Sequence, residues 1–79
     1  MKKYEFVQND TVREANGRIL HRIQALIDIP GVVCAGELGG YIEQEENLSH
    51  TGACWVYGNA QVYSNARVYG NAQVYSNAR

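Results

Sequence analysis

A repeat of six residues in the C-terminal part constrains this chain more than any other feature. Residues 56–67 read Val-Tyr-Gly-Asn-Ala-Gln-Val-Tyr-Ser-Asn-Ala-Arg, and residues 68–79 repeat these twelve residues without change. In this register one position always holds valine, the next tyrosine and another alanine: Val56, Val62, Val68 and Val74; Tyr57, Tyr63, Tyr69 and Tyr75; Ala60, Ala66, Ala72 and Ala78. A period of six would turn equivalent residues of a helix to different faces. It therefore excludes a helix and predicts a unit made of a strand and a corner.

Each six-residue unit has a part suited to a strand and a part suited to a turn. Alanine and the valine two residues later share one strand face, while the Gly-Asn or Ser-Asn pair tolerates the positive φ of a corner. The pattern extends back to Leu38, with Cys54 in an alanine position and the polar Gln44 and His50 in valine positions. We therefore predict an all-β fold in which residues 38–79 form a short parallel β-helix, a hexapeptide-repeat β-solenoid.

Residues 1–37 contain no repeat, and their signals are those of strands. Lys3 to Val7 predicts a short strand, and Asn16-Gly17 predicts a hairpin with a type I′ turn. Ile19 to Ile29 alternates as a strand does and also gives a helical face; we favour the strand, because the turn signal agrees with it. We predict that residues 1–37 cap the open edge of residues 38–79 and form one compact domain with them.

Size and composition exclude several classes of function. A chain of 79 residues has room for one domain, and seven Lys and Arg against eight Asp and Glu leave no basic patch for nucleic acid. No apolar run reaches the roughly 20 residues of a membrane span, and no apolar signal segment follows the first residues. The composition predicts a cytoplasmic protein with two free thiols, without a membrane or nucleic-acid partner.

The repeat also resembles a known class of proteins. The residues from Ala35 to Glu43, Glu46 to Ser49 and Trp55 to Ala60 are similar to small bacterial and prophage-borne hexapeptide-repeat proteins. These are left-handed parallel β-helices, commonly labelled polymer-forming or putative transferase, and the resemblance runs from about Arg18 to the end. It implies a left-handed coil with three hexads per turn, in which Tyr57 lies over Tyr75 and Asn59 over Asn77.

The residues capable of metal binding or catalysis do not form a recognisable site. His21, His50, Cys34 and Cys54 have no ligand-like spacing, so the sequence predicts no metal, no cofactor and no catalytic residue. Hexapeptide acyltransferases use a histidine as general base, which makes His50 the candidate if the chain is an enzyme. Little more than two coils and no inserted loop argue against that reading.

Two surfaces are candidates for binding a partner. The first is the set of outward tyrosines, which stack on one another or bind a partner at low entropic cost: Tyr57, Tyr63, Tyr69 and Tyr75. The second is an acidic rim, which is a solvated face or a docking patch for a basic partner: Glu37, Glu43, Glu45 and Glu46.

The repeat runs to the last residue, so its final coil has no cap of its own. The residues left at this open end are Val68, Ala72, Val74 and Ala78. Either another molecule stacks there or the natural protein is longer, and we predict a homodimer joined through the C-terminal coil.

The sequence supports three functional hypotheses. The first is a non-catalytic, dimeric interaction protein; the resemblance to prophage-borne proteins implies that it binds and inhibits a host or defence complex. The second is a trimmed relative or fragment of a hexapeptide acyltransferase. The third is a self-stacking structural scaffold.

Overall fold

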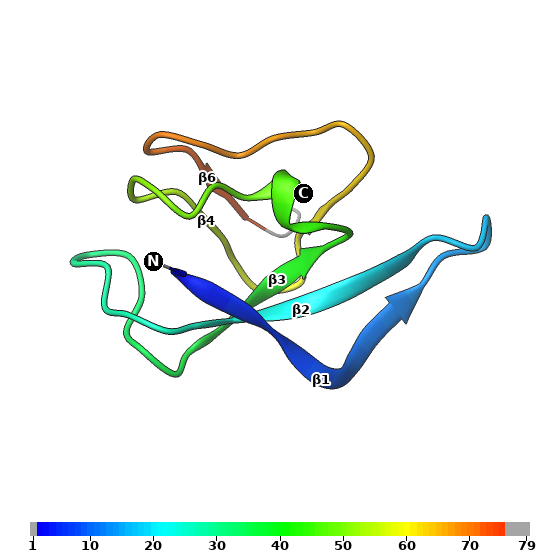
Figure 1. Ribbon diagram of the computed structural model, residues 1–79, viewed down its shortest axis with the longest axis horizontal. Helices are drawn as coiled ribbons and strands as arrows, with labels where there is room; N and C mark the ends of the chain where they lie inside the picture. Colours follow the sequence, from blue (N-terminus) through cyan, green and yellow to red (C-terminus); the bar gives the residue numbers. More distant parts are fainter. Residues whose placement is uncertain (1, 76–79) are drawn as a thin grey trace.

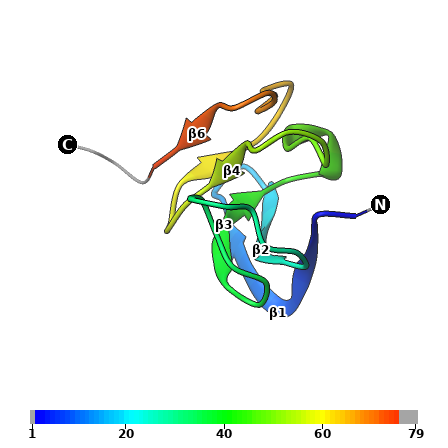
Figure 2. The same ribbon diagram turned by 90° about the vertical axis from the view of Figure 1, so that its left-hand side faces the viewer.

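The computed structural model describes residues 2–75. Its elements, in chain order, are β1 (Tyr4–Arg13), β2 (Ile19–Ala25), β3 (Leu38–Ile42), the 3₁₀ turn η1 (Glu45–Asn47), β4 (Trp55–Val56), β5 (Gln61–Val62) and β6 (Gln73–Val74). Four strands form a sheet in the order β1-β2-β3-β5, and β4 pairs with β6 in a second sheet. Figure 1 shows the long β1–β2 hairpin below the shorter strands, and Figure 2 shows β6, β4, β3 and the hairpin one below another.

The hairpin predicted around Asn16-Gly17 is present. Strands β1 and β2 pair antiparallel, and the Glu14 N–H donates to the Arg18 carbonyl at 2.7 Å across the turn. The type I′ turn is wrong, however, because only Gly17 has a positive φ, at +90°. The side-chain oxygen of Asn16 instead accepts the Arg18 N–H at 3.0 Å. This arrangement matches a three-residue hairpin loop that ends in a left-handed glycine.

The segment that follows the turn is a strand, as we favoured, over Ile19–Ala25. Beyond it, Ile29 bridges to Val33 around Pro30-Gly31. Strand β1 is longer than the predicted Lys3 to Val7, because it continues through an irregularity between Phe6 and Thr11. Asn9 has a φ of +67° within this bulge, and β1 bends sharply along its length (Figure 1).

The repeat region contributes parallel pairs, each very short. Strand β3 pairs with β5 through Ile42 and Val62, and β4 pairs with β6 through Val56 and Val74. A single parallel bridge joins Leu48 to Val68. Val56 and Val74 are equivalent positions of the repeat, eighteen residues apart, whereas Ile42 and Leu48, which are in alanine positions, pair with valines twenty residues later.

The predicted parallel β-helix is nevertheless wrong. Within residues 2–75 the strands form no closed solenoid; the main unit is a mixed four-stranded sheet in which parallel pairing is minor. The physical reason is strand length. Strands β4, β5 and β6 are each two residues long, whereas β1 and β2 have ten and seven residues, and β2 takes the five-residue β3 as an antiparallel partner. The sheet therefore extends from the hairpin, and the expected stacking of Asn59 on Asn77 falls outside the described residues.

The core lies where the hairpin meets the repeat region. Tyr4 and Ile23 come from the hairpin and Trp55 from β4, and all three are fully buried in one cluster. Gly40 lets β3 approach this cluster closely, because a Cβ there would lie 2.6 Å from the Ala60 carbonyl oxygen. In the described residues, no helix is long and apolar enough to cross a membrane.

Candidate binding groove

A groove of about 580 Å³ opens between η1, the loop that follows it, and the second layer of the repeat. Its lining combines charged, apolar and aromatic side chains: Glu45, Glu46, Leu48, Ser49, His50, Arg67, Val68 and Tyr69. We call it the Tyr69 groove. It is built from two segments that are about twenty residues apart in the sequence and are joined by the Leu48–Val68 bridge.

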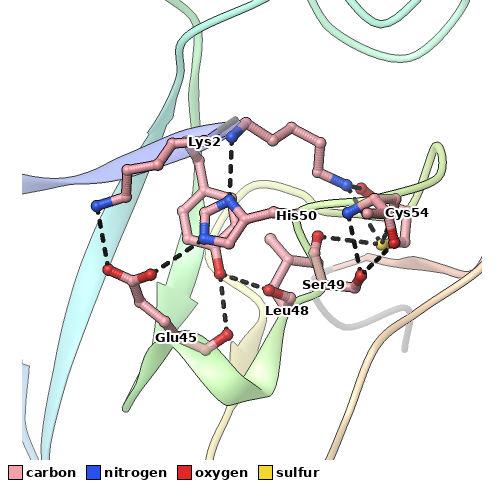
Figure 3. A network of polar contacts seen from close by, with 9 residues as sticks. Lys2, Glu45, Leu48, Ser49, His50 and Cys54 are labelled. Atoms are coloured by element: carbon pink, nitrogen blue, oxygen red, sulfur yellow. Dashed lines mark hydrogen bonds and ion pairs between the residues drawn. The ribbon is translucent and has the colours of Figure 1, made fainter.

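His50 forms one wall and is held by both of its ring nitrogens (Figure 3). The Lys3 backbone N–H donates to Nδ1 at 3.0 Å, so the imidazole proton resides on Nε2. Nε2 lies 3.1 Å from a carboxylate oxygen of Glu45 and donates to it. The Lys2 ammonium lies 3.3 Å from the other oxygen of that carboxylate. The hydrogen bond from His50, aided by Lys2 and opposed by partial burial, holds the pKa of Glu45 below its usual value.

Tyr4 packs against His50 and helps to hold it in place. Its ring stacks on the His50 ring with centroids 4.1 Å apart. Its hydroxyl lies within hydrogen-bonding distance of the carbonyl oxygens of Leu48 and Glu45, at 2.5 Å and 3.1 Å. Burial, and to a lesser degree the Glu45 carboxylate, raise the pKa of the Tyr4 phenol above its ordinary value. Lys3, which directly precedes β1, and Tyr4, the first residue of β1, therefore fix the position of His50.

On the floor and the opposite wall of the groove, the side chains are not engaged in such a network. Leu48 and Val68 are buried and form an apolar floor. Tyr69 stands beside it with 69% of its surface exposed. Glu46 and Arg67 are both exposed, and neither takes part in an ion pair within residues 2–75. One aromatic ring, one carboxylate and one guanidinium are thus available to a ligand.

The structure separates the tyrosines that the sequence grouped as one surface. Tyr57 and Tyr75 stack with ring centroids 4.6 Å apart, as the resemblance to hexapeptide-repeat proteins implied. The phenol of Tyr57 has a raised pKa because of partial burial and its neighbour Tyr75. Tyr63 lies instead under the guanidinium of Arg18, at 4.6 Å, and Tyr69 lies in the groove. The four rings occupy three places rather than one face.

The predicted acidic rim is divided in the same way. Glu45 and Glu46 line the Tyr69 groove. Glu43 pairs with Arg18 at 3.4 Å and accepts the Ser64 N–H at 2.8 Å. Glu37 lies apart, where its carboxylate accepts the Cys34 N–H at 3.3 Å.

The residues predicted for self-association have unequal exposure. Val68 is buried, with 6% of its surface exposed, and Val74 is half-buried against the core. Ala72 is exposed, and Ala78 lies outside the described residues. Strands β5 and β6 are both at the edge of their sheets.

The remaining candidates are dispersed. His21 stacks on Phe6 in the hairpin, Cys34 is exposed and Cys54 is buried. No group of three metal-ligating side chains occurs in the part of the chain that the structure describes. Sequence reasoning missed Lys3, Tyr4 and Arg67. The sequence does contain a signal for Arg67, because it places a charged residue at the position where the neighbouring repeats have glutamine. Lys3 and Tyr4 belong to no motif that would have identified them.

Comparisons with known proteins do not assign the chain. No protein-family model matches it, and no curated protein matches it. Neither finding tests the resemblance to hexapeptide-repeat proteins, so the function must be argued from the groove itself.

Proposed function

We propose that this chain is a non-catalytic interaction module that binds a segment of a protein partner in the Tyr69 groove. The observation that carries the proposal is the exposure of Tyr69 beside the apolar floor of Leu48 and Val68. A tyrosine buries a large area on binding at little cost in side-chain entropy, and such residues are enriched among the hot spots of interfaces.

The charges around Tyr69 define the chemistry of the partner. Glu46 and Arg67 are exposed and free of ion pairs within residues 2–75, while the charge of Glu45 is already matched by Lys2. The complementary segment carries an apolar or aromatic side chain flanked by one basic and one acidic group. The basic group pairs with Glu46 and the acidic group with Arg67.

The arrangement of His50 supports a non-catalytic role. A general base needs an imidazole nitrogen with a free lone pair within reach of its substrate. Here Nδ1 accepts the Lys3 N–H and Nε2 carries the proton donated to Glu45. An acyltransferase mechanism through His50 would have to break the hydrogen bond that it accepts from the Lys3 N–H.

The test is a selection of random peptides displayed on phage against the immobilised protein. Peptides that bind wild type are then measured against Tyr69→Ala and against Tyr63→Ala, a matched tyrosine outside the groove. We expect Tyr69→Ala to weaken binding about tenfold or more, as for a hot-spot residue, and Tyr63→Ala to leave it unchanged. Selected peptides that bind Tyr69→Ala as well as wild type would refute the groove. Acetyl-coenzyme A binding that is lost in His50→Ala would favour the acyltransferase instead.

A second copy of the chain is the partner we propose for the β5 and β6 edges. Edge strands carry backbone groups that can pair with another chain, and Tyr75, next to β6, has 63% of its surface exposed. Light scattering should give the mass of a dimer for wild type and of a monomer for Val74→Lys. Val12→Lys, a change of another half-buried valine in the hairpin, is the control and should remain dimeric. A monomeric wild type would refute this pairing, and a mass that grows with concentration would indicate the scaffold.

The identity of the partner as a host or defence complex rests on the resemblance alone. A host or defence complex is therefore the first class of protein to test with the selected peptides. A prophage-borne inhibitor would use the same groove, so that a selected peptide would compete with the complex for binding.

A further inference from the structure

Lys3 and Cys54 form a buried pair that the proposed function does not use. The Lys3 side chain has only 1% of its surface exposed, and Cys54 is fully buried. The Lys3 nitrogen lies 3.3 Å from the Cys54 sulfur, although the two residues are 51 positions apart in the sequence. A lysine amine and a cysteine thiol are thus held in contact away from bulk water.

The surroundings fix both groups in this position. The Lys3 amine donates to the carbonyl oxygens of Cys54, at 2.8 Å, and Gly52, at 3.3 Å. The Cys54 sulfur lies 3.6–3.7 Å from the carbonyl oxygens of Ser49, Thr51 and Val68. No other lysine or arginine side chain contacts this sulfur in residues 2–75, so Lys3 is the nucleophile positioned next to it.

We propose that Lys3 and Cys54 are a modification site at which peroxide joins the two side chains by a sulfur–nitrogen bond. Hydrogen peroxide, as the two-electron oxidant, converts the Cys54 thiol to a sulfenic acid and releases water. The Lys3 ammonium gives up a proton, and the neutral amine attacks this sulfur; the S–O bond breaks, and the leaving hydroxide takes up a proton to form a second water. A proton is lost from the nitrogen, and the product is a sulfenamide that lacks one hydrogen from each residue. A first thiol attacks the sulfur and returns the amine, which leaves a mixed disulfide on Cys54, and a second thiol then releases the Cys54 thiol.

The geometry gives the pair an advantage over the other thiol of the chain. Cys34 is exposed, its backbone N–H donates to the Glu37 carboxylate, and the described residues that line the pocket beside it include no lysine or arginine. Its sulfenic acid has no amine in place and proceeds to higher oxides or to a disulfide between molecules. Peroxide reaches Cys54 through opening of the loop at residues 49–53, whose Thr51 and Gly52 are exposed.

The link would tie Lys3, which directly precedes β1, to Cys54, which directly precedes β4. Closing a loop of this length restricts the unfolded chain and therefore raises the unfolding temperature of the oxidised protein. Reduction would return the chain to its original stability, so that the N-terminal strand is fastened reversibly under oxidising conditions.

The test uses Cys34→Ser, which removes the competing thiol and any disulfide within the chain. The folded variant is treated with increasing hydrogen peroxide and its intact mass is measured without reductant. We expect a loss of about 2 Da, restored by dithiothreitol, and a rise in the unfolding temperature. Tryptic digestion should yield a peptide that joins Lys3 to Cys54, with no cleavage after Lys3.

Two matched controls identify the nitrogen. Cys34→Ser with Lys3→Arg keeps the positive charge but removes the amine, and should gain oxygen instead of losing hydrogen. Cys34→Ser treated in denaturant keeps every residue but loses the 3.3 Å contact, and should also gain oxygen only. This second control serves if the Lys3 variant does not fold.

Several outcomes would overturn the proposal. One is the same loss of hydrogen in the Lys3→Arg variant, which would assign the nitrogen to the backbone. A second is a gain of about 14 Da, which would place an oxygen between nitrogen and sulfur. A third is an unmodified Cys34→Ser protein at peroxide concentrations that fully oxidise Cys34 in wild type.

Discussion

The hairpin and the repeat region differ in what holds their neighbouring chain segments together. Strands β1 and β2 are long, have no repeated sequence, and are joined by an antiparallel backbone ladder. The repeat region has the most regular sequence and the shortest strands, since β4, β5 and β6 have two residues each. There, side chains contribute much of the connection between layers: Tyr57 stacks on Tyr75, and the Asn47 amide donates to the carbonyls of Ser64 and Ala66.

The comparison shows that a regular sequence does not by itself give a regular sheet. The repeat supplies equivalent inward positions, but two-residue strands hold few backbone hydrogen bonds. Each region also depends on the other for its core, since Trp55 of β4 packs against Tyr4 of β1 at a centroid distance of 6.3 Å. Five substitutions test this dependence, from the largest expected effect to the smallest.

Trp55→Ala should have the largest effect, because this fully buried ring joins the two regions. We expect a loss of about 3–5 kcal/mol in the free energy of unfolding, measured by circular dichroism in urea. Tyr69→Ala, at an exposed ring, should change it by no more than about 0.5 kcal/mol. Hydrogen exchange that leaves the hairpin protected in Trp55→Ala would show that the hairpin is stable alone and would break the comparison.

Lys3→Met should come next. The buried ammonium donates to two backbone carbonyls of the loop before β4, and these would lose a charged donor. The expected loss is about 1.5–3 kcal/mol in urea denaturation. Lys2→Met provides the control at the neighbouring position, whose exposed ion pair is worth about 0.5 kcal/mol or less. Equal effects of the two changes would mean that the buried lysine does not hold the regions together.

Tyr4→Phe removes the hydroxyl that reaches the Leu48 and Glu45 carbonyls, and should cost about 1–2 kcal/mol. Because the folded pKa of Tyr4 is raised, the neutral phenol is favoured in the fold. Wild-type stability should therefore be complete below about pH 10, where unfolded tyrosine begins to ionise, and should fall as the pH rises further. Urea midpoints between pH 8 and 11 should decline less in Tyr4→Phe than in Tyr69→Phe. Parallel declines would contradict this role of Tyr4.

Tyr75→Ala tests the stack within the repeat region. Loss of the offset ring pair with Tyr57 should cost about 0.5–1.5 kcal/mol, more than Tyr69→Ala, which removes an equally exposed ring without a stacking partner in the described residues. Thermal unfolding of the two variants side by side measures the difference. Identical unfolding temperatures for Tyr75→Ala and Tyr69→Ala would show that the backbone places the two rings side by side and that their stacking does not stabilise the fold.

Glu45→Gln should have the smallest effect, because the carboxylate is largely solvated. The pKa of Glu45 is lowered in the fold, so its contribution is present above the unfolded value of about 4.3 and is lost as the pH falls through the folded value. The wild type should thus lose slightly more stability than Glu45→Gln between pH 5 and 3. A steeper loss of stability in Glu45→Gln than in wild type would contradict the role of His50 as the hydrogen-bond donor to Glu45.

The candidate site was predictable only in part. The repeat register placed Leu48 and Val68 in inward positions and made Glu45, Glu46 and Tyr69 candidates for binding. It did not place them in one groove, because their meeting depends on the Leu48–Val68 bridge. Grouping the four tyrosines as one surface failed because each corner of the repeat has a different neighbour, such as Arg18 beside Tyr63.

The sequence by itself determined local features whose causes are local. Gly17 ends the hairpin loop and Ile19 to Ala25 extends as a strand, because turn chemistry and alternation act over short distances. Only the tertiary structure decided that β3 pairs with the hairpin and that Lys3 reaches Cys54. Those contacts join segments without a shared pattern, and they form because burying Trp55 and Tyr4 together stabilises one particular packing of the two regions.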